Sequence, residues 1–215
     1  MKTIIIALSV VFVIAVISDA KAEWMFINEA EIAAEWTGGS LETDAEFIKQ
    51  GEGSIKWEHA INTGVRTSAI PTDWSEYTHF SMSIYSEKIT NSEFVAIIES
   101  PNGAVDGMDY WKIAINPDIN NRIKIDWEGS WQDFRDIPFA DMAVVRQPLG
   151  FDQITQVSFS ATWDNWIPDP DAVLYIDDMY VTDGTPRPEI DGVDLRAVNI
   201  ETALATTWGK LKMIY

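Results

Sequence analysis

The sequence predicts an all-β protein whose strands form an antiparallel two-sheet β-sandwich. Apolar and polar residues alternate with a period of two, the pattern of a half-buried strand, in segments 55–58, 80–85, 111–115, 123–127 and 157–161. Turn-forming residues separate the segments at short intervals, at 62–64, 101–103, 116–118 and 128–129. No long amphipathic helical pattern interrupts them, and residues 29–36 are a candidate for only one turn or a short helix. Many short strands separated by turns are typical of a sandwich.

Length and charge narrow the class of protein further. The 215 residues, 47% of them hydrophobic, suit one core-forming domain. There are 34 acidic and 15 basic residues, which gives a formal net charge of −19. This charge repels nucleic-acid phosphates and anionic lipid headgroups, so we expect neither partner. The sequence contains no cysteine, which excludes disulfides, thiolate zinc sites and cysteine nucleophiles.

Residues 1–22 have the pattern of a secretory signal peptide. Lys2 precedes an apolar run over 4–17, and Ala20 and Ala22 supply the small residues that a signal peptidase recognises. The run is shorter than the 20 or so residues of a membrane-spanning helix, although an uncleaved anchor is the alternative. We therefore predict a secreted or periplasmic protein that has no membrane contact after cleavage.

A boundary follows the last predicted strand, residues 173–181. Gly184, Pro186 and Pro188 indicate a linker over 184–190, so the sandwich domain is predicted to span 23–183. The remaining tail, 191–215, is too short to fold alone. Leu204, Trp208 and Leu211 have the spacing of one helical face. This spacing predicts an amphipathic docking or sorting segment, the opening of a further domain, or a surface helix on the sandwich.

Several short motifs, in order along the chain, resemble one known family. They are Phe26-Ile27-Asn28-Glu29, Trp36, Gly51 to Trp57, Asp73 to Tyr77, Asp126 to Trp131, and Leu174 to Met179. Together they are similar to carbohydrate-binding-module jelly rolls of the galactose-binding-like superfamily, which occur free-standing or attached to polysaccharide-degrading enzymes. The resemblance covers residues 24–183. It implies a jelly-roll topology and a role in sugar binding, without indicating which sugar.

The resemblance, together with the adjacent aspartates of the last strand, predicts a structural calcium ion. In such a jelly roll the first and last strands lie side by side, and calcium requires oxygen ligands. The family's ligands would correspond to Glu29 or Glu31, Gly51, Asp177 and Asp178. A buried unpaired carboxylate is costly, so the two aspartates need a partner. The alternative is a bulge at which both face water.

Exposed aromatic side chains are the expected sugar contacts, because an indole or phenol ring packs on the C–H face of a sugar. Trp57, Trp111 and Trp127 share the inward register of neighbouring isoleucines, and Trp74 and Trp131 are predicted packing anchors. The loop 162–168 holds two further tryptophans and is either the ligand platform or a cap on the sandwich. The candidate binding residues are Trp163, Asn165, Trp166, Tyr85, Tyr110 and Arg122.

The sequence favours binding over catalysis. Residues 189–194 superficially resemble the carboxylate signature of laminarinase-like hydrolases, but the motif ends in Asp and follows two prolines. A lyase needs bases and cations for a uronate substrate, and the only histidines are His59 and His79. We therefore expect a non-catalytic module that binds poly- or oligosaccharide. The alternatives are an adhesive protein-interaction domain on the same fold and a lyase or glycoside hydrolase.

Overall fold

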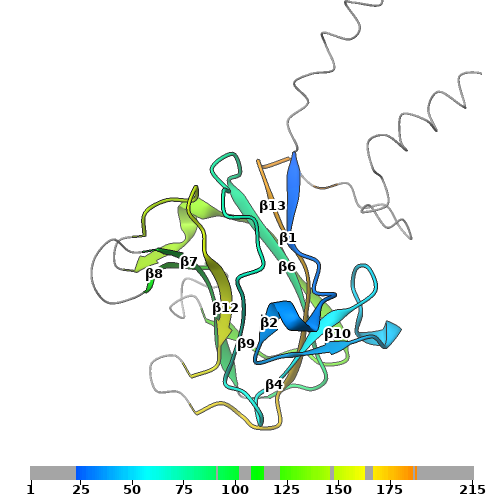
Figure 1. The fold of residues 1–215 in the computed structure, drawn as a ribbon. Helices are drawn as coiled ribbons and strands as arrows, with labels where there is room; N and C mark the ends of the chain where they lie inside the picture. Colours follow the sequence, from blue (N-terminus) through cyan, green and yellow to red (C-terminus); the bar gives the residue numbers. More distant parts are fainter. Residues whose placement is uncertain are drawn as a thin grey trace, which may run out of the picture.

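The computed structural model describes residues 23–90, 92–101, 108–113, 122–145, 148–162, 167–185 and 187. Within these ranges the protein is built from two antiparallel sheets with short 3-10 turns, and they contain no α-helix (Figure 1). Across the same ranges, no helix is long and apolar enough to cross a membrane. The predicted signal peptide and the tail 191–215 lie outside the described residues.

Sheet A has six strands in the order β10-β6-β13-β4-β3, and β1 also pairs with β13. Their bounds are β1 Trp24–Asn28, β3 Ser40–Glu42, β4 Ser54–Glu58, β6 His79–Ser86, β10 Ser130–Pro138 and β13 Val173–Thr182. β13 pairs with β4 through its first half and with β1 through its second half. The first and last strands are therefore neighbours, as the jelly-roll prediction required.

Sheet B has seven strands in the order β11-β8-β7-β12-β5-β2, and β9 also pairs with β7. Their bounds are β2 Trp36–Thr37, β5 Gly64–Thr67, β7 Glu93–Pro101, β8 Met108–Lys112, β9 Ile123–Lys124, β11 Ala143–Val145 and β12 Gln156–Ser160. The 3-10 turns are η1 Ala33–Glu35, η2 Ala45–Phe47 and η4 Phe139–Asp141. The short helix predicted within 29–36 is η1.

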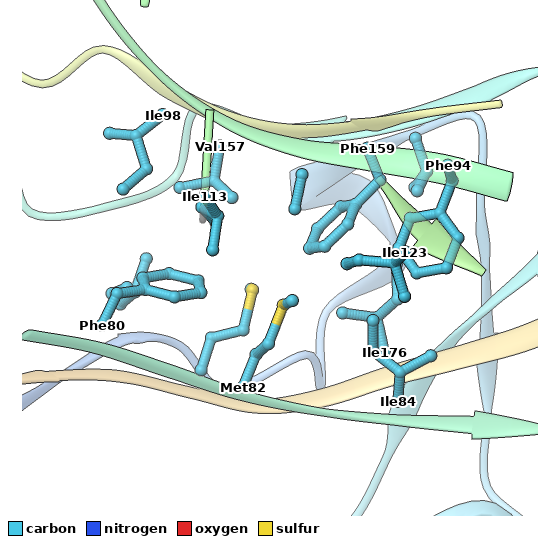
Figure 2. Packing of buried hydrophobic residues seen from close by; sticks show 14 of the residues in the cluster. Phe80, Met82, Ile84, Phe94, Ile98, Ile113, Ile123, Val157, Phe159 and Ile176 are labelled. Carbon is cyan, nitrogen blue, oxygen red and sulfur yellow. The ribbon is translucent and has the colours of Figure 1, made fainter. Parts of the chain in front are cut away.

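The hydrophobic core lies between the two sheets. Figure 2 shows Phe80, Met82 and Ile84 of β6 facing Ile98 of β7 and Val157 and Phe159 of β12, all of which are buried. Burial of such side chains is the main favourable contribution to folding. Trp57, Trp74 and Trp111 belong to this core, and Trp127 packs against it while half-buried. The predicted core tryptophans therefore face inward.

Two long strands differ from the predicted pattern for physical reasons. β7 carries the apolar run Phe94 to Ile98 without alternation, because its outward residues Val95 and Ile97 are also buried, in a second cluster with Tyr110. A strand buried on both faces shows no period of two. β10 loses its alternation at a bulge between Phe134 and Ile137, where Asp136 has φ 50°.

Candidate functional site

The outer face of sheet B, turned away from the core, carries two rows of side chains that run across the strands. Successive residues of a strand point to opposite faces, and the register aligns the outward residues of neighbouring strands. One row consists of Lys112, Ile97, Ser158 and Arg66, and the next consists of Tyr110, Glu99 and Gln156. We call these seven residues the sheet B face.

A hollow of about 370 Å³ opens on the sheet B face where β7, β12, β5 and β2 meet. Its lining includes Arg66, Glu99, Gln156 and Ser158, with Ile97 as an apolar contribution. Because a lining of mixed apolar and polar groups can offer both van der Waals contact and hydrogen bonds, such a hollow suits a small organic ligand with polar groups.

Glu99 lines the hollow and is held there by two hydrogen bonds. Its side chain comes from the centre of sheet B, and the residue is only 5% exposed. The Oε1 atom accepts hydrogen bonds of 2.8 Å from Gln156 Nε2 and 2.7 Å from Ser158 Oγ. None of the described residues donates a hydrogen bond to Oε2. A carboxylate held in one orientation is a strong acceptor for a hydroxyl group.

Donors and apolar groups surround this acceptor. Arg66 is exposed and lies opposite Ser158 in the register of β5 and β12. On the other side, Tyr110 packs with Val95 and Ile97 and is 8% exposed. The tyrosine ring is therefore a wall of the face rather than an open stacking platform. The combination offers an anionic acceptor, a cationic donor and an apolar border within one surface.

Two of the predicted sugar-binding residues lie on opposite sides of the molecule. Tyr110 is on the sheet B face, as described. Tyr85 is on the outer face of sheet A, where it is 6% exposed beneath the η2 turn; the prediction that it is an open aromatic contact is corrected. The ring of Phe47 lies 5.3 Å from that of Tyr85 and stacks on Tyr175 at 4.3 Å. The turn that carries Phe47 is what covers this face.

Arg122, another predicted contact, does not join the sheet B face. Arg122 is half-buried beside β9, where its Nη1 lies 3.2 Å from Glu93 Oε2. It borders a separate hollow with Trp127 and Gln132. Trp163, Asn165 and Trp166 lie outside the described residues, so their role as a ligand platform stays a prediction.

The aspartates predicted to bind calcium are held by nitrogen donors. Asp177 Oδ2 accepts hydrogen bonds of 2.8 and 2.9 Å from the backbone N–H groups of Lys49 and Gln50, and Oδ1 accepts one of 2.6 Å from Asp178 N–H. Burial raises the pKa of Asp177 to about 7, although these three N–H groups lower it. Asp178 forms ion pairs with Arg135 and Arg187. Both aspartates lie at a bulge of β13 and both are buried rather than facing water.

The other predicted calcium ligands do not complete a cation site with them. Glu31 Oε1 accepts a hydrogen bond of 2.7 Å from Glu52 N–H, and Gly51 occupies a turn with φ 79°. Among the described residues, no group of three or more Asp, Glu or His side chains converges as metal ligands would. A calcium ion needs oxygen lone pairs directed at it. The oxygens of Asp177 instead accept hydrogen bonds from backbone N–H groups, and both oxygens of Asp178 lie within ion-pair distance of an arginine guanidinium group. These residues do not fit the ion.

Sequence reasoning missed the polar members of the sheet B face. Arg66, Glu99, Gln156 and Ser158 are far apart in the chain and belong to no motif. The outward register of β12 did carry a signal, since Gln156, Ser158 and Ser160 alternate with the core residues Val157 and Phe159. A second signal was Glu99, a charged residue directly after the apolar run of β7.

Comparisons with known proteins establish the fold. No protein-family model matches the chain, and no curated protein matches it. A family 30 carbohydrate-binding module of a cellulosomal cellulase of Clostridium thermocellum is similar in structure, with 14% identity, a TM-score of 0.51, and coverage of 76% of this chain and 99% of that one. Another family 30 module structure has 15% identity, a TM-score of 0.50 and coverage of 75% and 99%.

A family 11 module from Clostridium thermocellum, in complex with a β-1,3-1,4-mixed-linked tetrasaccharide, is also similar. It has 18% identity, a TM-score of 0.49, and coverage of 76% of this chain and 97% of that one. The family 30 likenesses confirm the predicted jelly roll of the carbohydrate-binding-module type.

Proposed function

We propose that this protein binds carbohydrate on the sheet B face. The observation that carries the proposal is Glu99, a buried carboxylate that lines the hollow and whose Oε1 is held by two donors. A sugar presents vicinal hydroxyls that both donate and accept. Glu99 would accept from one hydroxyl, while Arg66 would donate to a neighbouring one. The modules to which the fold is similar are consistent with this use of a jelly roll.

The charge of the molecule favours a neutral sugar. The chain carries a net charge of −19, and Glu99 adds a negative charge inside the hollow itself. A uronate or sulfate group placed beside that carboxylate would be repelled. Hydroxyl groups would instead strengthen their hydrogen bonds by meeting an ionised acceptor.

We infer that the protein binds its sugar without cleaving it. Glycosidases use a pair of carboxyl groups on either side of the scissile bond. Of the described residues that line the hollow, Glu99 is the one carboxylate. We also propose that residues 1–22 act as a signal peptide that directs export of the protein. The sequence pattern alone supports this part of the proposal.

The test is affinity electrophoresis and calorimetry of the purified protein with a panel of neutral polysaccharides, namely β-glucans, xylan, mannan and agarose. Glu99→Gln and Arg66→Ala should each weaken the binding constant about 10- to 100-fold, because a hydrogen bond to a charged group contributes about 1.5–3 kcal/mol. Glu58→Gln is the matched control, since Glu58 ends β4 in sheet A and pairs with Lys56. Thermal melts of each variant check that the fold is retained.

Three outcomes would contradict the proposal or a part of it. If the protein binds none of the polysaccharides in the panel, the sheet B face has no sugar ligand among them. Binding that survives Glu99→Gln and Arg66→Ala but is lost in Trp163→Ala and Trp166→Ala would instead place the site on the loop 162–168. Release of reducing sugar from any polysaccharide would overturn the non-catalytic part.

A further inference from the structure

Asp178 is a buried carboxylate in an unusual backbone conformation. The residue is 2% exposed and has φ 52°, a region that side chains other than glycine seldom adopt. The register of β13 against β6 shifts between Asp177 and Tyr180. This bulge places the carboxylate of Asp178 among groups on the outer face of sheet A. Removing a carboxylate from water is costly unless an opposite charge meets it.

Two guanidinium groups supply that charge. Arg187 Nη1 lies 2.7 Å from Asp178 Oδ1 in an ion pair, and its Nη2 donates a hydrogen bond of 2.9 Å to Oδ2. This two-atom contact matches the fork of a guanidinium to a carboxylate. Arg135 Nη2 donates a second hydrogen bond of 2.9 Å to Oδ2 and also donates to Ser83 Oγ at 3.0 Å. Both oxygens of Asp178 therefore face a positive charge.

Aromatic rings hold the arginines from the other side. The guanidinium carbon of Arg187 lies 4.2 Å from the ring centre of Tyr180, and the rings of Phe26 and Trp24 lie at 5.3 and 5.7 Å. The corresponding distance from Arg135 to Tyr180 is 5.4 Å. Cation–π contacts of this kind strengthen when water is excluded, and the side chain of Arg187 is only 8% exposed.

The contacts join β10 to the region from β13 to Arg187, two parts of the chain that are distant in sequence. Arg135 comes from β10, Asp178 from the centre of β13, and Arg187 from beyond the end of β13, with rings of β1 alongside. This is the junction of first and last strands at which a structural cation was expected. Guanidinium groups lie there within ion-pair distance of both Asp178 oxygens, in the place that the ion would occupy.

We propose that Arg135 and Arg187 together replace a structural metal ion at this junction. The pair supplies the positive charge that neutralises Asp178 and links β10, β13 and the segment after β13. The fold then has no calcium requirement at this place. Arg187, which the sequence assigned to a linker, is part of the folded domain.

Thermal unfolding of the full chain tests the proposal. With excess EDTA or with millimolar CaCl₂, the wild-type midpoint should be the same, because an ion bound only to the native state would raise it. Arg187→Met and Arg135→Met should each lower the midpoint by about 10 °C, as expected for removing one partner of a buried ion pair in a domain of this size. The long apolar methionine preserves most of the contact with the rings.

Lys88→Met is the matched control, because Lys88 forms an ion pair with Asp171 in which both side chains are largely exposed. It should shift the midpoint by about 1 °C or less. A wild-type midpoint that rises with calcium would overturn the proposal, and so would an Arg187→Met variant as stable as the control. If Arg187→Met does not fold while Lys88→Met does, that result is the extreme form of the expected loss.

Discussion

A buried histidine should make the stability of this protein depend on pH. His59 is 4% exposed and lies against Trp57, with ring centres 4.4 Å apart. Its Nδ1 is 3.3 Å from Ser92 Oγ, and Nε2 is buried without a partner among the described residues. Burial lowers the pKa of His59 from 6.5 to about 4, and Asp169 offsets only part of this shift. The folded protein therefore holds this imidazole neutral.

The sign and size of the effect follow from proton binding. The unfolded chain takes up a proton at His59 as the pH falls below 6.5, but the folded protein resists protonation until about pH 4. Stability from this group is thus present above pH 6.5 and is lost progressively between pH 6.5 and pH 4. At pH 5 the loss amounts to about 2 kcal/mol of the free energy of unfolding.

Urea unfolding followed by tryptophan fluorescence measures this loss. The free energy of unfolding is determined at pH 7 and pH 5 for the wild type and for His59→Gln. The advantage of the wild type over the variant should shrink by about 2 kcal/mol at pH 5, because other titrating groups are common to both proteins. His79→Gln, at the start of β6, is the matched control for loss of a histidine. An advantage that is equal at the two pH values would refute the reasoning.

Two further substitutions test local packing by the same unfolding assay. Gly38→Ala should destabilise the fold by about 2–3 kcal/mol, because Gly38 has φ +91° and its added Cβ would lie 2.2 Å from Gly64 O. The control Gly129→Ala should cost about 1–2 kcal/mol, because Gly129 has φ +60° but nothing within 4 Å of an added Cβ. Equal losses in the two variants would contradict the role of the clash. Phe47→Ala should cost about 1–3 kcal/mol, because it removes the contact of the Phe47 ring with the rings of Tyr85 and Tyr175. It should also make Tyr85 more reactive toward acetylation or iodination. An unchanged reactivity of Tyr85 would show that η2 is not what covers it.

Period-two patterns located most of the sandwich, and where they failed the cause was local. Segments 55–58, 80–85 and 157–161 correspond to β4, β6 and β12 with small changes at their ends. Segment 123–127 forms a strand only at Ile123–Lys124, and β8 ends at Lys112. β7 was missed because both of its faces are buried, which removes the alternation that a sequence can display.

Side-chain roles were harder to predict than strands. The inward direction of Trp57 and Trp111 followed from alternation with isoleucines. Tyr85 also points out of the core, but whether an outward residue meets water depends on what covers it. In this protein the η2 turn, brought from residues 45–47, places Phe47 over the ring. Only the tertiary contact decides that exposure.

By itself, the sequence determined the all-β class, the jelly-roll pairing of first and last strands, and the inward faces of the strands. The class and the inward faces depend on local periodicity and on turn residues, which are written in contiguous segments, whereas the pairing of first and last strands was predicted from the family resemblance. The tertiary structure decided the sheet B face and the partners of Asp178. Both assemble residues from distant strands through sheet register, and register depends on the pairing of whole strands rather than on any one segment. For the same reason, two adjacent aspartates indicated that a positive charge was needed, and only the fold supplied it as Arg135 and Arg187.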